Sequence, residues 1–248
     1  MAENLNQSHA FIGKGKIFMT PITGAVRGKP FWVGVASALS FAHSVEDEKE
    51  LIEHHSGTNQ VWDVSAGTKK TTVSLTIQER RLEAMRAALQ ATVETVETGS
   101  VTAEEHTVDA IGDMAFLKHS DVTVTTVVDS TSGTPKTLSE NTDYKIDKQY
   151  GRIEMLTDGH TGPIKVGYTY GAATVMKPMT DDVDFYELRI DGMNTVGQKD
   201  KQIVTAYRVK LNPADAYDLI NDDFAEMQIE GTALFDESRN AAYEIKTV

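Results

Sequence analysis

Three short stretches of this 248-residue chain carry side chains that could bind a metal ion or a phosphate group. His54 and His55 follow Glu50 and Glu53, and imidazole and carboxylate groups are common zinc ligands. Adjacent histidines point to opposite sides of a strand, however, and no third ligand lies at a typical spacing. We therefore favour a polar loop, either solvated or lying in an interface, over a metal site.

The other two stretches are incomplete versions of known binding loops. Asp181, Asp182 and Asp184 offer carboxylates to calcium, but the glycine and terminal glutamate of an EF-hand loop are missing. The glycine and lysine run at 13–16 lacks the spacer and the Lys-Ser/Thr ending of a phosphate-binding P-loop. We favour a solvated turn, or one facing the interior of an assembly, for the acidic stretch.

Signs of catalysis are also missing from the sequence. The chain has no cysteine, which excludes a disulfide framework and any thiolate nucleophile or metal site. No Gly-x-Ser-x-Gly motif is present, and 37 acidic residues make carboxylate pairs common by chance. We expect neither an enzyme nor a cofactor, and we interpret Trp32 and Trp62 as core or interface anchors in preference to sugar platforms.

The net charge of −13 argues against tight binding to nucleic acid. Such binding needs clusters of basic residues, whereas an acidic protein repels phosphates. The N-terminus lacks the basic and apolar regions of a secretory signal, and no apolar run reaches 18 residues. We therefore expect no membrane association.

The elements that would position these side chains are mostly strands. Residues 69–77 alternate between Val73, Leu75 and Ile77 on one face and hydroxyl side chains on the other, which predicts a sheet buried on one side. Apolar side chains at helical spacing predict one helix over 78–91, with a weaker candidate over 213–221. Further strands are expected at 11–20, 29–43, 106–117, 121–129, 142–147, 150–156, 163–170, 172–177, 183–192, 201–211 and 224–236.

This pattern predicts a mainly β chain, an antiparallel β-sandwich or barrel-like domain flanked by one helix. Residues 1–9 are interpreted as a loose arm, 43–69 as a long polar loop and 98–177 as a hairpin-rich insertion or subdomain. Small residues at 34 and 36–38 indicate close approach of other backbone or of a neighbouring subunit.

Four stretches carry a family resemblance. They are Phe11–Phe18 with the strand 31–41, the charged segment Val45–Gly57 leading into 71–77 and its helix, Asn141–Asp147 with Tyr150–Ile153 and Val166–Gly171, and Leu211–Ala214 with Leu219–Phe224 and Glu230–Leu234. In this order they resemble the major tail tube proteins of long-tailed, siphophage-type bacteriophages. Each is a pattern of residue classes, and together they extend over most of the chain.

The resemblance implies a virion protein that assembles in the host bacterial cytoplasm into stacked hexameric rings. The inner strands of a ring would join into one β-barrel around a channel that conducts double-stranded DNA from capsid to host. Implied partners are further copies of the chain and the tape measure, tail terminator and distal tail proteins. The segment 43–69 would reach a neighbouring ring or subunit, with contact candidates Glu46, Glu48, Glu50, Glu53, His54, His55 and Trp62.

A channel with a negative wall would leave DNA free to slide, because basic contacts would hold it. We therefore expect some acidic side chains to face the bore, from the candidates Asp181, Asp182, Asp184, Glu187, Glu226 and Glu230. Two other functions stay open. A carbohydrate-binding or adhesin-like β-sandwich would share the strand-rich, acidic character, whereas a hydrolase on such a fold has no motif in its favour.

Overall fold

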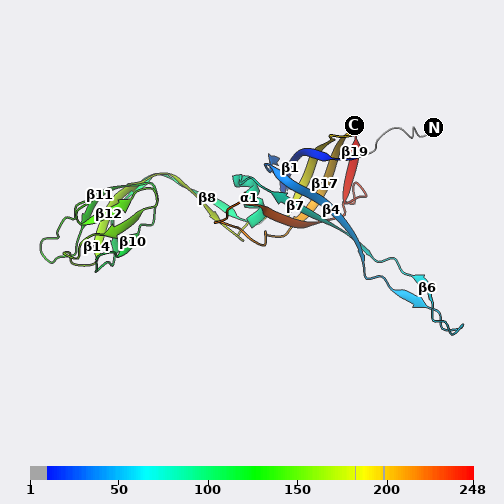
Figure 1. The fold of residues 1–248 in the computed structure, drawn as a ribbon, viewed down its shortest axis with the longest axis horizontal. Coiled ribbons are helices and arrows are strands. Elements are labelled where there is room, and N and C mark those ends of the chain that lie inside the picture. The colour runs from blue at the N-terminus through cyan, green and yellow to red at the C-terminus, as the bar shows by residue number, and fades with distance from the viewer. Residues whose placement is uncertain (1–9, 182, 198) are drawn as a thin grey trace. The chain divides into compact units, whose positions relative to one another are not determined.

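The computed structural model of the chain describes residues 10–181, 183–197 and 199–248. This part of the chain is mainly β, with antiparallel strands and one α-helix, which confirms the predicted fold class at that level (Figure 1). The chain divides into two compact units. Unit 1 comprises Met1–Thr92 with Lys177–Val248, and unit 2 comprises Val93–Met176. The predicted arm 1–9 and Asp182 lie outside the described residues.

Unit 1 is built on one nine-stranded sheet, whose main path runs β2-β1-β16-β17-β18-β7-β4. β3 pairs with β1, and β19 pairs with β17. The strands are β1 (Gly13–Thr23), β2 (Val26–Arg27), β3 (Phe31–Trp32), β4 (Ala36–Glu46), β7 (Thr68–Ile77), β16 (Phe185–Asn194), β17 (Lys201–Leu211), β18 (Met227–Ala233) and β19 (Tyr243–Thr247).

The sheet divides at β17. Residues 202–206 of this strand pair with β19, and residues 209–211 pair with β18. The two branches enclose a core of buried aliphatic side chains, among them Leu75, Leu188 and Ile229. Phe41 of β4 stacks on Tyr243 of β19 with ring centroids 4.8 Å apart. These two strands share no ladder of hydrogen bonds, so the sheet does not close into a barrel within the described part of the chain.

Helix α1 (Leu82–Leu89) is shorter than the predicted 78–91. Ala84, Ala87 and Ala88 lie in the unit 1 core, whereas Leu82 is 46 % exposed. The small alanine side chains allow the helix backbone to approach the sheet closely. The helix ends at Gln90, which adopts a left-handed conformation with φ of 47°.

The helix predicted over 213–221 is wrong, because that segment forms bends and turns in the structure. The amide of Asn212 donates to Glu230 O at 2.7 Å, and the amide of Ala214 donates to Ala88 O at 2.7 Å. These long-range bonds hold the start of the segment to β18 and to the end of α1, so Asn212 does not cap a helix.

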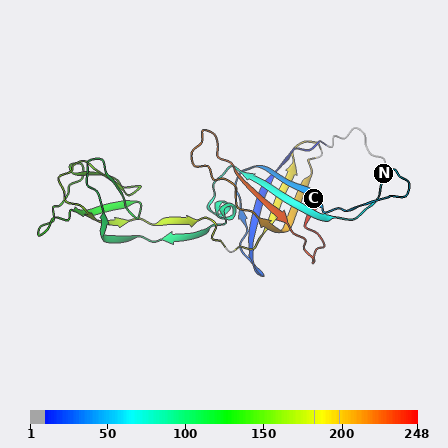
Figure 2. The same cartoon turned by 90° about the horizontal axis from the view of Figure 1, so that it is seen from below.

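The predicted long loop 43–69 contains several strand segments. β4 continues to Glu46 and β7 begins at Thr68, and the ribbon is extended by β5 (Glu50–Ile52) and β6 (Val61–Val64). Figure 1 shows β4 and β7 running out of the sheet together, with β6 towards the far end, and Figure 2 shows the same cartoon turned by 90°. Neither side of this ribbon is buried, so its sequence lacks the alternation that reveals a strand.

Unit 2 consists of two three-stranded sheets and a two-stranded ribbon, in the orders β10-β13-β12, β11-β14-β9 and β15-β8. Tyr168, Ile153 and Ile164 are fully buried in its core. The strands are β8 (Thr92–Val96), β9 (Gly99–His106), β10 (Met114–Phe116), β11 (Val122–Val128), β12 (Tyr144–Asp147), β13 (Arg152–Met155), β14 (Ile164–Tyr170) and β15 (Ala173–Lys177).

The strands predicted between 121 and 177 are confirmed to within two residues at each end. The strand predicted at 106–117 is right only for Met114–Phe116, because residues 107–113 connect β9 to β10 without strand structure. The Asp113 carboxylate accepts the amides of Asp109 and Ala110 at 2.8 and 2.9 Å, and these bonds fix the turn. Among the described residues, no helix is long and apolar enough to span a bilayer.

Candidate assembly surfaces

The loop at the end of the β5–β6 hairpin is organised around Glu53. Its carboxylate accepts hydrogen bonds from the amides of His55 and Ser56 and from the hydroxyls of Ser56 and Thr58. These bonds, led by the Ser56 hydroxyl, lower the pKa of Glu53 to about 2. Glu53 therefore shapes the loop as a fixed anion, and its oxygens are already occupied.

The other predicted contact residues lie along the same ribbon. Glu46 pairs with Lys70 at 3.3 Å, and His54 Nδ1 lies 3.2 Å from Asn59 Oδ1. His55 sets its ring edge-on to Trp62 with centroids 5.5 Å apart. Glu48 and Glu50 are exposed. Within the described ranges, no three His, Cys, Asp or Glu side chains gather as metal ligands would.

Trp62 projects from a β-bulge. Leu51 pairs with Asp63 and Ile52 pairs with Val61, so Trp62 is the additional residue on its strand. Its side chain is 68 % exposed. The apolar side chains around it are 40–60 % exposed, and together they form what we call the tip cluster, Leu51, Ile52, Val61, Trp62 and Val64. Strand register places Ile52 beside Val61 and turns Leu51 to the opposite side of the hairpin. Exposed apolar side chains gathered at one hairpin end mark a candidate surface for interaction.

A second surface is the outer face of the β18-β7-β4 branch, opposite the core. The alternation predicted for residues 69–77 is confirmed, with Val73, Leu75 and Ile77 buried and Thr72, Ser74 and Thr76 turned outward. In the register of the sheet, Thr72, Ser74 and Thr76 each lie between one residue of β4 and one residue of β18, and these neighbours also have small or polar side chains. We call the resulting grid the polar face, which consists of Ala38, Ser40, Ala42, Thr72, Ser74, Thr76, Gln228, Glu230 and Thr232.

The polar face carries a single charged residue, Glu230. Gln228 donates to Glu230 Oε1 at 3.0 Å and to Ser74 Oγ at 3.3 Å, so the amide ties neighbouring side chains together. Glu226 is exposed just before the strand and accepts a hydrogen bond from Gln78 at 2.9 Å. Two of the predicted bore acids thus lie on or beside one flat, nearly neutral surface.

The remaining predicted bore acids that the structure describes have partners within the fold, and Asp182 lies outside the described residues. Asp181 pairs with Arg86 at 3.2 Å, and its side chain is only 8 % exposed. Asp184 accepts the amide of Gly24 at 2.6 Å, and Glu187 pairs with Arg27. Arg86 and Arg27 offset the charges of Asp181 and Glu187, whereas the amide donor leaves the charge of Asp184 in place.

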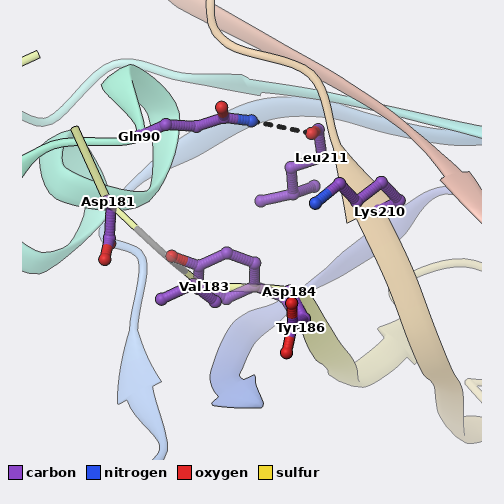
Figure 3. Close-up of a pocket in the computed structure, with 7 residues that line it drawn as sticks. All are labelled: Gln90, Asp181, Val183, Asp184, Tyr186, Lys210 and Leu211. Atoms are coloured by element: carbon purple, nitrogen blue, oxygen red, sulfur yellow. Dashed lines mark hydrogen bonds between the residues drawn. The ribbon is translucent and has the colours of Figure 1, made fainter. Parts of the chain in front are cut away.

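Asp181 and Asp184 border a narrow crevice together with Tyr186 (Figure 3). Gln90 closes one side by donating to Leu211 O at 2.9 Å. Burial raises the pKa of the Tyr186 phenol to about 12. The crevice measures about 10 Å³, which suffices for roughly one water molecule. We do not regard it as a ligand site.

A larger groove of about 340 Å³ opens on the core side of unit 1, between the start of β1 and the start of β4. Two strand edges border it. Residues 13–16 of β1 pair with β16 on one side only, and β4 pairs with β7 on one side only, among the strands described. Its lining is largely apolar and includes Phe11, Ile17, Leu39, Phe41, Met193 and Val204.

The sequence alone did not identify this groove or the polar face. The small residues at 34 and 36–38 indicate close approach of other backbone or of a neighbouring subunit, which stays a prediction; Ser37 and Ala38 line the groove. Residues such as Phe11, Met193 and Val204 come from distant parts of the chain, and only strand register brings them together.

The chain belongs to the family described as "Protein of unknown function UCP028589", whose model matches residues 10–245. The match extends through unit 1 and unit 2, so both are parts of the family domain. No curated protein matches the sequence.

Proposed function

We propose that this protein is the structural subunit of a siphophage-type tail tube, which forms stacked hexameric rings around a channel for double-stranded DNA. The proposal rests on the sequence resemblance and on one structural observation. Unit 1 leaves an eleven-residue strand, β4, paired along one edge only among the described strands. Long open edges invite pairing with other chains, and closed rings are a regular way to satisfy them.

The polar face supports the channel part of this proposal. Hydroxyl and methyl side chains with one carboxylate offer no cationic site at which a phosphate would be held. If this face lines the bore, DNA would slide along a wall without strong contacts. Arg189 lies elsewhere on the same sheet and is paired with Asp191 at 3.0 Å, which reduces its free positive charge.

Negative-stain electron microscopy of the purified protein tests this proposal. We expect rings or hollow tubes at high protein concentration, with DNA absent from the preparation. A protein that sediments as a monomer at every concentration would refute the tube, because nothing would then complete the open edge of β4.

A carbohydrate-binding function is a second candidate, and one observation favours it. Unit 2 exposes Phe116 and Tyr150, which are 67 % and 70 % accessible, and aromatic rings of this kind can stack on sugars. Binding of the monomer to immobilised glycans, abolished by Tyr150→Ala, would support this function over the tube.

A further inference from the structure

The structure around the tip cluster holds Trp62 exposed and in a fixed position, which favours its insertion into another surface. The bulge turns Trp62 out of the strand ladder, and the hydrogen bonds to Glu53 fix the adjoining loop. The His55 ring supports one side of the indole. A side chain presented on a fixed support loses less conformational entropy on binding than one on a loose loop.

The groove offers an apolar surface with no covering strand among the described residues. Its volume of about 340 Å³ falls in the range of pockets that admit a ligand-sized group. Met193 at its rim is 49 % exposed and Phe11 is 62 % exposed. Filling the groove would therefore remove considerable apolar area from water.

The tip cluster of one chain cannot reach the groove of the same chain. Leu39 lines the groove, and β4 stays paired with β7 from there to Glu46. Seven residues of strand span about 23 Å. The hairpin then continues away through β5 and β6 (Figure 1). The two surfaces can therefore meet only between different copies.

We propose that the tip cluster of one copy inserts into the groove of a second copy, with Trp62 as the anchor. This inference rests on the proposed function and specifies one contact by which the subunits associate. The contact joins two different surfaces, so each copy offers one tip and one groove. Such head-to-tail contacts generate rings when the rotation closes and filaments when it does not.

The charges around the two surfaces are complementary. Lys14 lines the groove, and Lys201 pairs across the sheet with Met193 at the rim. The hairpin carries Glu50 and Asp63 on the strands that present the tip cluster, and both are exposed. Opposite charges at the rim of an apolar contact mainly accelerate and orient association, and salt weakens them.

One such contact should be weak by itself. A buried tryptophan with its neighbours removes a few hundred Å² from water, well below the area of a stable two-protein interface. Repetition around a ring or along a stack links the contacts, which strengthens them together. We therefore expect Trp62 to act as a hot spot in the polymer.

Two variants test the contact from its two sides. Trp62→Ala removes the anchor and leaves the groove intact. Gly192→Leu fills the groove and leaves the tip intact. A Cβ at Gly192 would meet its nearest atoms at 3.5 Å and beyond, so the fold should accept it. Met193→Glu repels the acidic tip without filling the groove, and it serves as the second groove variant if Gly192→Leu fails to fold.

We expect either variant to raise the concentration at which assembly begins by about 30-fold, as loss of a hot spot would. Tyr150→Ala is the matched control, since Tyr150 is aromatic and as exposed as Trp62. It should assemble like the unmodified protein. Equal loss of assembly in Tyr150→Ala would overturn the inference, since general hydrophobicity would then explain the effect.

The decisive experiment mixes the variants. Tagged Trp62→Ala, mixed at high concentration with untagged Gly192→Leu and chemically cross-linked before washing, should retain it on an affinity resin, because one intact groove meets one intact tip. It should retain untagged Trp62→Ala at least about 10-fold less. Equal retention of both partners, or of neither, would overturn the pairing of tip and groove.

The outcomes for the contact and for the tube are separable. If Trp62→Ala forms tubes normally, the proposed contact is refuted and the proposed function is unaffected. If the two variants pair selectively but the protein never forms tubes, the tube is refuted and the contact is supported.

Discussion

The two units of this chain differ in the open strand edges and apolar surfaces to which we assign a role in assembly. Unit 2 buries a core between its two small sheets, and buried Asp129 has its carboxylate oxygens hydrogen-bonded by neighbouring groups. Unit 1 also has a full core, yet it leaves an open edge on β4, an apolar groove and the exposed tip cluster. Under the proposed function, neighbouring copies would cover these surfaces of unit 1, whereas we assign no assembly contact to unit 2.

Comparable large-to-small substitutions in the two cores should produce the largest difference between the units in their effect on assembly. Leu188→Ala in unit 1 and Ile153→Ala in unit 2 each empty a fully buried site, which costs about 2–5 kcal/mol of unfolding free energy. We expect Leu188→Ala to abolish assembly and Ile153→Ala to spare it. Both tryptophans, Trp32 and Trp62, lie in unit 1, so their emission follows that unit while hydrogen exchange follows both.

This comparison fails if Ile153→Ala prevents assembly while the tryptophan emission stays native. Unit 2 would then supply contacts that we assign to unit 1.

Acid should weaken unit 2 through its hydrogen-bonded carboxylates. The Thr131 hydroxyl, with the amides of Lys136, Thr131 and Thr161, lowers the pKa of Asp129 well below its ordinary value. A group with a lowered folded pKa stabilises the protein above its unfolded pKa, and this stabilisation fades as the pH falls below about 4. We expect the melting temperature of unit 2 to drop in that range.

Asp129→Asn should flatten this pH dependence, measured by hydrogen exchange between pH 2.5 and 7. Asp113 and Asp143 have lowered pKa values too, so part of the slope should remain. The control is Asp158→Asn, since Asp158 is exposed. An unchanged slope in Asp129→Asn would show that other groups govern the acid response.

Sequence patterns predicted the fold where one side of a strand is buried. β17 was predicted at its observed bounds, and the faces of β7 were assigned correctly, because both strands press apolar side chains against the core. The strands β5 and β6 within the predicted loop 43–69 were missed, since water covers both of their sides. The segment 213–221 was mistaken for a helix, since its bonds to β18 and α1 are long-range.

The candidate surfaces were harder to predict than the elements. The bore candidates were chosen for their acidity, but only register shows that Glu230 shares a face with Ser74, or that Asp181 is paired with Arg86. The residue type of Trp62 predicts a core or interface anchor, and no observation tests this role. Its bulge and its exposure came only from the structure.

A smaller effect is expected where the two branches of the unit 1 sheet meet. The stacked pair Phe41 and Tyr243 should contribute about 0.5–1.5 kcal/mol beyond its buried area. A double-mutant cycle with Phe41→Ala and Tyr243→Ala, followed by urea unfolding, measures this coupling. Strictly additive losses would mean that the rings do not hold the branches together.

The smallest change in stability should come from the polar face. Glu226→Lys with Glu230→Lys alters exposed side chains, so unfolding free energy should change by less than about 0.5 kcal/mol. Tubes of this variant should nevertheless retain DNA at low salt and release it as salt rises, because lysines at the bore bind phosphates. Asp158→Lys in unit 2 is the matched control and should retain none. Equal retention by both variants would place the polar face outside the channel.

A cryo-electron microscopy reconstruction of the polymer formed by the purified protein tests the central claim most directly. Our account predicts a hollow cylinder of sixfold rings in which the strands carrying Ser40, Ser74 and Glu230 form the inner wall. A bore lined by lysine and arginine, or a subunit whose β4 edge stays open to solvent, would contradict it.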